Sequence, residues 1–354
     1  MARSELLSAS GGDEERIEEE RDEQGLRPQS LDDFVGQEQL KGHLRVMLTA
    51  ARQRGQAMGH LLFAGPPGLG KTTLSAIIAN EMGANIHITS GPALEKGGDL
   101  AAILTKLEDG DVLFIDEIHR LARPVEEVLY PAMEDFQLDL VLGKGPAART
   151  MRLPVSRFTL IGATTRTGLI TGPLRDRFDY PARLDYYEPA ELQSIVVRAA
   201  GILGVDIDEE GAGEIARRSR GTPRISNRLL RQVRDFAAVE RDTVIDEDVA
   251  RDGLEFFGVD HRGLDKATRA VLIALCEMFK GGPVGLKTLA ISVSEPTETV
   301  EDVYEPYLIQ QGFLMRTPKG RMATASAWEH VGLTPPMESP DKSLPPGLFD
   351  DPGE

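Results

Sequence analysis

The chain has 354 residues, of which 41% are hydrophobic and 27% are charged, and its formal net charge at pH 7 is −17. This size and composition predict two or three globular domains with ordinary cores. No apolar run approaches the ~20 residues that a membrane helix needs, and the single Cys276 excludes an intramolecular disulfide framework. We therefore expect a cytoplasmic protein without membrane contact.

The negative charge is concentrated at the two ends of the chain. Residues 1–25 hold nine acidic and three basic side chains, and residues 331–354 hold five acidic and one basic side chain. The N-terminus turns acidic after Met-Ala-Arg-Ser-Glu, which is not the pattern of a secretory signal. We expect residues 1–25 and 337–354 to be disordered tails. The overall charge therefore disfavours nucleic acid as a partner, and any such contact would have to come from a local basic element.

Apolar strands alternate with helices in residues 26–186, the predicted large domain. We expect strands at residues 60–64, 111–115 and 158–163, and a helix at residues 72–82. Continuous apolar runs flanked by glycine turns, with helices between them, predict an α/β domain with a parallel sheet covered on both faces.

Two further domains are predicted after the large domain. Residues 187–258 form a small helical bundle, with helices at 190–203, 209–218, 223–240 and 246–257. Residues 259–336 begin with a helix at 265–279, continue through two shorter helices and end in two strands within 313–324. Three helices followed by a hairpin are the outline of a winged helix.

The segment Gly65-Pro-Pro-Gly-Leu-Gly-Lys-Thr72 follows the first strand and begins the next helix. Its glycines allow backbone N–H groups, including that of Gly68, to converge on phosphate oxygens, and the helix dipole adds to this attraction. Lys71 would contact the β- and γ-phosphates of ATP, and the Thr72 hydroxyl would ligate Mg²⁺. An incidental glycine-rich turn is the alternative, and the strand–turn–helix context argues against it.

A second strand ends in paired carboxylates, Asp116 and Glu117. Asp116 would hold Mg²⁺, and Glu117 would orient and polarise the attacking water. Alone, such a pair is often only a solvated strand end, but its place downstream of the P-loop favours hydrolysis. For His119, a packing or capping role is favoured over catalysis.

Three more residues extend the predicted catalytic set. Thr164, at the end of a third strand, is the candidate to reach the γ-phosphate or the lytic water. Arg177 and Arg224 would stabilise the charge that develops on the transferring phosphoryl oxygens, from the same or a neighbouring subunit. As isolated arginines, both would more often be surface ion-pair partners.

Two hairpins are candidates for binding partners. Residues 137–158 form one, and Met151 and Leu153 would share one of its faces; the alternative is that this face packs on the large domain. The second is the wing at 313–325, where Arg316, Lys319 and Arg321 occur without an acidic residue. Three cations suit contact with phosphates at any sequence, and a merely solvated hairpin is the equal alternative.

The chain resembles the RuvB family of AAA+ motors over about residues 26–336. The segments that carry the resemblance are the P-loop at 65–73, the strand and carboxylate pair at 113–121, Glu127-Val-Leu-Tyr-Pro-Ala-Met-Glu-Asp135, the strand end at 162–166 and Gln310-Gln-Gly-Phe-Leu314. The resemblance implies an ATP-driven DNA translocase that drives branch migration of Holliday junctions with RuvA, in homologous recombination and DNA repair. It implies a homo-oligomeric ring, expected to be a hexamer, with double-stranded DNA and RuvA as partners and RuvC as a further one.

The resemblance also implies roles for single residues. The base of the nucleotide would be flanked by Leu26 and Arg27, and its phosphates by Gly68, Lys71, Thr72 and Thr73. Further positions near a bound nucleotide would be Glu134, Asp135, Phe136 and Tyr187, the last at the domain junction. Arg177 would be the arginine finger offered to the next subunit, and Arg224 the second sensor. Met151 and Leu153 would dock on RuvA, and Arg316 and Arg321 would contact the DNA backbone.

Two other functions stay open at this point. An ATP-gated clamp-loader or initiator-type switch would share the first two domains, although clamp loaders usually end in a helical collar. A winged-helix transcription regulator is disfavoured, because residues 296–304 carry Glu298, Glu301 and Asp302, a poor surface for the DNA major groove.

Overall fold

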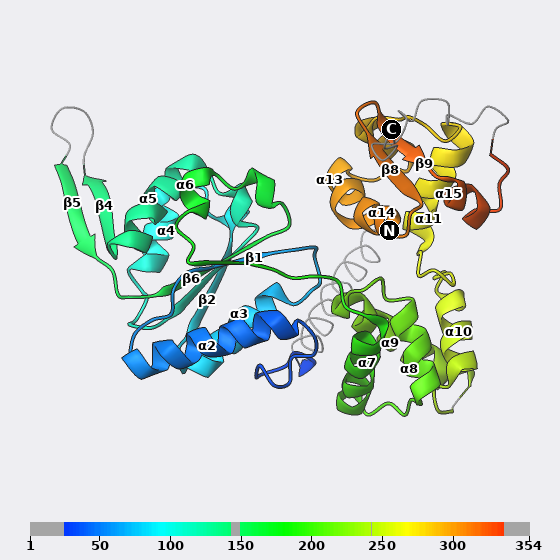
Figure 1. Cartoon of the computed structure of the whole chain (residues 1–354), viewed down its shortest axis with the longest axis horizontal. Helices are drawn as coiled ribbons and strands as arrows, with labels where there is room; N and C mark the ends of the chain where they lie inside the picture. The colour runs from blue at the N-terminus through cyan, green and yellow to red at the C-terminus, as the bar shows by residue number, and fades with distance from the viewer. Residues whose placement is uncertain (1–24, 143–148, 242, 336–354) are drawn as a thin grey trace, which may run out of the picture. The chain divides into compact units, whose positions relative to one another are not determined.

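The computed structural model describes residues 25–142, 149–241 and 243–335 (Figure 1). Two compact units divide between Phe257 and Gly258, and each is described by itself. The predicted tails lie outside the described residues. Within the described part, no helix is long and apolar enough to cross a membrane.

The first unit is built on a five-stranded parallel sheet with the order β2-β3-β6-β1-β7. The strands are β1 Leu61–Ala64, β2 Ile86–Ser90, β3 Val112–Asp116, β6 Thr159–Thr164 and β7 Tyr180–Arg183. Helix α2, Glu38–Arg54, precedes the first strand, and the helices between the strands are α3 Lys71–Met82, α4 Gly97–Leu104, α5 Arg123–Glu134 and α6 Gly172–Arg175. Short 3₁₀ turns cover Gly91–Ala93, Ile118–Arg120 and Thr167–Leu169. The expected parallel sheet is confirmed, and β2 and β7 extend it beyond the strands expected from the sequence.

The strand period of two distributes the apolar side chains over both faces of the sheet. Phe63 and Phe114 belong to the core under α2 and α3, whereas their neighbours Leu62 and Leu113 belong to the core under α4 and α5. Helices therefore cover both faces, as Figure 1 shows. Because all strands run in parallel, their carboxyl ends lie along one edge, where an α/β sheet binds its ligands.

The hairpin expected at residues 137–158 is present as an antiparallel pair, β4 Gln137–Leu142 and β5 Arg149–Pro154. It projects from the sheet domain next to α5 (Figure 1). Residues 143–148, between the two strands, lie outside the described residues.

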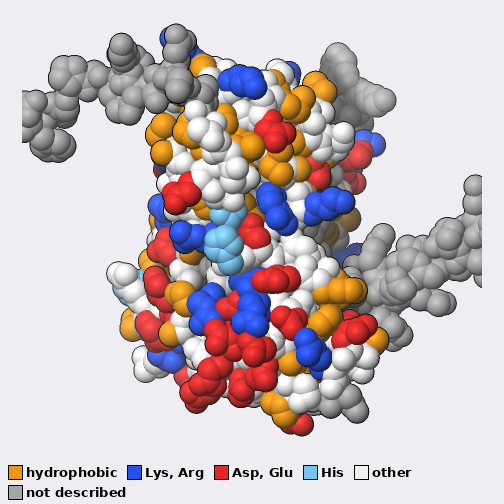
Figure 2. Space-filling model, turned by 90° about the vertical axis from the view of Figure 1, so that its right-hand side faces the viewer, with side chains coloured by type: hydrophobic (Ala, Val, Ile, Leu, Met, Phe, Trp, Pro, Cys, Tyr) orange, Lys and Arg blue, Asp and Glu red, His pale blue; other side chains and the backbone are white. Residues whose placement is uncertain are grey.

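The helical bundle follows at α7 Pro189–Leu203, α8 Glu209–Arg217, α9 Pro223–Glu240 and α10 Glu247–Phe256. Asp208 and Asp246 cap α8 and α10 by accepting from backbone N–H groups three residues on. Ion pairs such as Arg217–Glu247 connect the helices. Figure 2 shows one face of the molecule, on which basic side chains lie among acidic ones instead of forming a single basic field.

In its described residues, the second unit contains a hairpin, three helical segments before it and one short helix after it. The first is α11 Lys266–Ile273, which continues as a π-helical turn, Ala274–Met278, and the second is α12 Leu286–Ser292. The third runs from α13 Thr297–Thr299 through a π-helical turn, Val300–Tyr304, into α14 Glu305–Gln310. The hairpin is β8 Leu314–Thr317 and β9 Gly320–Ala323, and α15 Ala325–His330 ends the unit. This order confirms the expected winged helix.

Candidate nucleotide site

The turn between β1 and α3 requires glycine at several positions, Gly68 and Gly70 among them. Gly68 and Gly70 have φ values of 81° and 95°, which L-residues rarely adopt. A Cβ atom on Gly68 would lie 3.0 Å from Cβ of Arg224, and one on Gly70 would lie 3.2 Å from the ring of Phe34. The turn therefore stays narrow, and its backbone N–H groups remain accessible at the start of α3.

Lys71 is the first residue of α3, and its ammonium group donates to the carbonyl oxygens of Gly65 and Pro66, both at 2.8 Å. Burial lowers the pKa of Lys71, and the nearby carboxylates of Asp116 and Glu117 oppose this shift. The Lys71 cation is suited to contact phosphate oxygens, whereas the two carboxylates beside it are suited to a metal ion or a water molecule rather than to phosphate.

The paired carboxylates follow directly from the end of β3. The Asp116 carboxylate accepts from the backbone N–H of Glu117 at 2.9 Å. Glu117 has a left-handed backbone with φ of 48°, rare for a residue with a side chain. Both side chains line the same cavity as Lys71 and Thr72.

Thr165, rather than the expected Thr164, lies at this cavity. The Thr165 hydroxyl donates to the Glu117 carboxylate at 3.3 Å. Thr164 is fully buried, and its hydroxyl lies 2.9 Å from Nδ1 of His119. Thr164 is the last residue of β6 and Thr165 directly follows it, and of the two only Thr165 lines the cavity. Thr165 is therefore the better candidate than the expected Thr164 for contact with the γ-phosphate or the lytic water.

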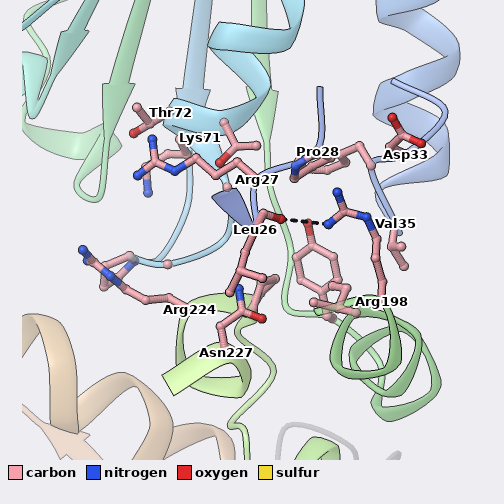
Figure 3. A pocket seen from close by; sticks show the side chains of 18 of the residues that line it. Leu26, Arg27, Pro28, Asp33, Val35, Lys71, Thr72, Arg198, Arg224 and Asn227 are labelled. Atoms are coloured by element: carbon pink, nitrogen blue, oxygen red, sulfur yellow. Dashed lines mark hydrogen bonds between the residues drawn. The ribbon is translucent and has the colours of Figure 1, made fainter. Parts of the chain in front are cut away.

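The cavity has a volume of about 290 Å³ and is formed by three parts of the first unit. Figure 3 shows side chains from the N-terminal segment, the start of α3 and the helical bundle around it. The bundle contacts the P-loop directly, since the backbone N–H of Arg224 donates to the Gly68 carbonyl at 3.3 Å. The expected residues that line the cavity are Leu26, Arg27, Gly68, Lys71, Thr72, Thr73, Asp116, Glu117, Tyr187 and Arg224.

The sequence reading missed several lining residues. Arg198 donates to the Leu26 carbonyl at 2.8 Å and so holds the N-terminal segment over the cavity. Asn227 lies three residues after Arg224, so both share one face of α9. The Asn227 Oδ1 atom is buried without a partner in the described structure. A buried acceptor of this kind fits a hydrogen-bond donor of a bound ligand.

Arg177 lies in a different place, in a second cavity of about 360 Å³ that also takes in Glu134 and Phe136. Its guanidinium pairs with Glu134 at 3.2 Å, donates to the Pro173 carbonyl at 2.7 Å and lies 4.4 Å from the centre of the Tyr130 ring. Arg177, Glu134, Asp135 and Phe136 do not line the P-loop cavity of their own chain.

The two residues expected to bind a partner have different environments. Leu138 and Leu153 are paired across β4 and β5, and Leu153 packs against the core of the sheet domain. Met151 lies two residues away on the same face of β5 and is 40% exposed. Leu153 therefore packs on the parent domain but stays partly exposed, and Met151 is the more accessible of the two to a partner.

The wing arginines of the second unit share one carboxylate. Arg316 and Arg321 each donate two hydrogen bonds to Glu305, at distances between 2.8 and 3.1 Å. Lys319, at the tip of the hairpin, is exposed.

Comparisons with known proteins cover the described chain almost end to end. Residues 26–184 match the family described as Holliday junction DNA helicase RuvB P-loop domain. Residues 187–260 match the RuvB AAA lid domain, and residues 261–332 match the RuvB C-terminal winged helix domain.

Similar proteins carry the same family name. The RuvB subunit of the Holliday junction branch migration complex of Rubrobacter xylanophilus is 60% identical over 94% of this chain and 95% of its own length. That of Oleidesulfovibrio alaskensis is 61% identical over 90% of this chain and 99% of its own. The Thermotoga maritima RuvB Holliday junction branch migration motor superposes with a TM-score of 0.81 at 50% identity, covering 88% of this chain and all of the other.

Proposed function

The chain belongs to the RuvB family, and we propose that it is the ATP-driven motor that moves Holliday junctions along DNA in homologous recombination and repair. The observation that carries this proposal is the P-loop cavity, which joins the sheet domain and the lid of a chain that is matched to RuvB throughout. An AAA+ motor needs this arrangement, because nucleotide bound between two domains can couple hydrolysis to their relative movement.

The residues around the cavity fit ATP and Mg²⁺. The glycine turn and Lys71 would hold the phosphates, and the unpartnered Asn227 acceptor leaves a polar contact for the rest of the nucleotide. The Thr72 hydroxyl and the Asp116 carboxylate are hard oxygen ligands of the kind that Mg²⁺ prefers, and phosphate oxygens commonly complete such a site. Bound Mg²⁺ would neutralise charge on the phosphates.

Hydrolysis would use Glu117 and Thr165 together. The Glu117 carboxylate would orient and polarise the attacking water. The Thr165 hydroxyl, which already donates to that carboxylate, is placed to hold the same water or a γ-phosphate oxygen. Arg224, whose backbone touches the P-loop, would sense the phosphates from the lid.

Arg177 would complete the site of a neighbouring subunit. Its guanidinium lies outside the cavity of its own chain, beside Glu134 and Phe136. An arginine finger supplied in trans stabilises the charge of phosphoryl transfer, and a trans site requires a ring of subunits, for which we propose a hexamer. Glu134, Asp135 and Phe136 would then lie near the neighbour's nucleotide.

The partners follow from the other two surfaces. The head, residues 261–332, would bind the backbone of duplex DNA through its wing. Met151 would contact RuvA, with RuvC joining the assembly, in the cytoplasm. A clamp-loader or initiator-type switch is not favoured by any of these features, since the last domain matches the RuvB winged helix.

A synthetic four-way junction with labelled homologous arms tests the proposal. We expect the chain with RuvA, ATP and Mg²⁺ to convert the junction into two duplexes, and the Lys71→Ala chain to leave it intact. A protein that binds the junction and hydrolyses ATP without converting it would be a switch rather than a motor.

A further inference from the structure

The carboxylate of Glu305 lies between the two arginines of the wing. Arg316 and Arg321 are directly opposite each other in the β8–β9 pair. The Glu305 Oε1 atom accepts from Nε of both, at 2.8 and 2.9 Å, and its Oε2 atom accepts from an Nη2 group of each, at 2.9 and 3.1 Å. The Glu305 side chain is only 1% exposed. One carboxylate at the start of α14 therefore holds both strands of the hairpin.

The Glu305 carboxylate offsets the repulsion between the two arginines of the hairpin. Two like charges directly opposite each other destabilise a strand pair, and a buried carboxylate is costly unless it is paired and hydrogen-bonded. Burial of Glu305 would raise its pKa, but the hydrogen bonds and charges of both arginines outweigh burial and hold its pKa below the usual value. The bidentate geometry also fixes the planes of both guanidinium groups.

The same geometry leaves donors for a further anion. A guanidinium has five N–H groups, and Glu305 engages only Nε and Nη2 of each arginine, so the Nη1 groups stay outside this interaction. The Arg316 side chain is 49% exposed and that of Arg321 is 17% exposed. Both arginines thus keep part of their surface for a ligand while their orientation is set from behind.

We propose that Glu305 is a positioning residue for DNA, which orients Arg316 and Arg321 so that their remaining N–H groups meet backbone phosphates. The proposal rests on the proposed role of the head in binding DNA. The predicted effect of this negative charge on DNA binding is the opposite of the usual one. A negative charge beside a DNA-binding surface ordinarily weakens binding, whereas this one strengthens it by removing the rotational freedom of two side chains.

The test compares two substitutions that each remove one negative charge. Glu305→Gln loses the bidentate acceptor. Glu301→Gln is the control, because Glu301 lies on the same helical segment and approaches the same arginines only at 3.6 and 3.8 Å. Binding of the full chain to a fluorescent duplex is measured by anisotropy at several salt concentrations. We expect Glu305→Gln to bind about three- to tenfold more weakly, with a salt slope reduced by about 1 to 2, and Glu301→Gln to bind as tightly as the parent or more tightly.

Three further variants separate the possible failures. Glu305→Asp keeps the charge but shortens the side chain, so it is expected to weaken binding as Glu305→Gln does. The head should stay folded in this variant, which a melting transition above the assay temperature would show. Unchanged or tighter binding by Glu305→Gln would overturn the positioning role. If Arg316→Ala and Lys319→Ala also leave binding unchanged, the head itself is not the DNA contact, and the proposed function of the wing fails instead.

Discussion

The imidazole of His119 connects the ends of two neighbouring strands, because its Nδ1 atom lies 2.9 Å from the Thr164 hydroxyl. The same nitrogen is 3.2 Å from the carboxylate of Glu117. The side chain is only 6% exposed, so these contacts are made away from bulk water. A histidine that was expected merely to pack or cap therefore also touches the proposed catalytic carboxylate.

Replacing His119 with Ala is expected to lower kcat for ATP hydrolysis by about 10- to 100-fold, because a small misplacement of the water-orienting carboxylate is costly. The KM for ATP should change little, since His119 does not line the cavity. Steady-state turnover gives both constants. His119→Asn, which places a polar atom near the original Nδ1 position, should recover part of the rate. An alanine variant with the parent kcat would return His119 to a packing role.

The two adjacent threonines should differ in what their hydroxyls do. Thr165→Val removes the hydroxyl at the cavity, and we expect kcat to fall about tenfold or more while the melting temperature is retained. Thr164→Val leaves buried partners of its hydroxyl, His119 and the N–H of Arg166, without that contact, at a cost of about 1–3 kcal/mol of stability. Turnover and thermal unfolding of both variants check this. An active Thr165→Val chain beside a stable, inactive Thr164→Val chain would assign the sensing role to Thr164.

Much of this site could be predicted because its signals are local. The P-loop, Lys71 and the pair Asp116–Glu117 occupy fixed places relative to predicted strands, and their positions follow from the sheet. The choice between Thr164 and Thr165 could not be made in this way, because both follow the same apolar run and only the strand register decides which one faces the cavity. A one-residue shift exchanges the faces.

Contacts between segments that lie far apart in the chain could not be predicted from the sequence. Nothing near Arg198 indicates that it donates to Leu26, 172 residues away. The wing contains three cations and no acidic residue of its own, so its sequence predicts a positively charged hairpin. In the structure, the carboxylate that pairs with Arg316 and Arg321 comes from Glu305 on the preceding helix. The composition of a hairpin predicts its charge environment only where neighbouring helices and strands contribute no charged side chain.

Subunit mixing tests whether Arg177 works in trans. An Arg177→Ala chain is expected to bind ATP but to hydrolyse it about 10³-fold more slowly or worse. A Glu117→Gln chain should be inactive as well. Mixed rings would place the intact Glu117 of one variant beside the intact Arg177 of the other, so the mixture should regain part of the ATP turnover that each lacks alone.

Arg175 provides the control for this experiment. It is an exposed arginine on α6, two residues before Arg177, and Arg175→Ala should hydrolyse ATP as the parent does. Mixtures with no more activity than the sum of their parts, under conditions where both variants assemble, would place the finger in its own site. That result would conflict with the placement of Arg177 in a cavity other than its own P-loop cavity.

Substitutions of two apolar residues on one face of β5, Met151 and Leu153, should have different effects. Met151→Asp changes a side chain that is 40% exposed, so thermal stability and basal ATP turnover should stay at parent values. Its junction conversion with RuvA should be lost, because an interface core does not tolerate an unpaired charge. Leu153→Ala should instead lower the free energy of unfolding by about 1–3 kcal/mol, because Leu153 packs against the core of the sheet domain. If Met151→Asp still responds fully to RuvA, the contact lies elsewhere. If Leu153→Ala melts at the same temperature as the parent but no longer responds to RuvA, Leu153 belongs to the interface.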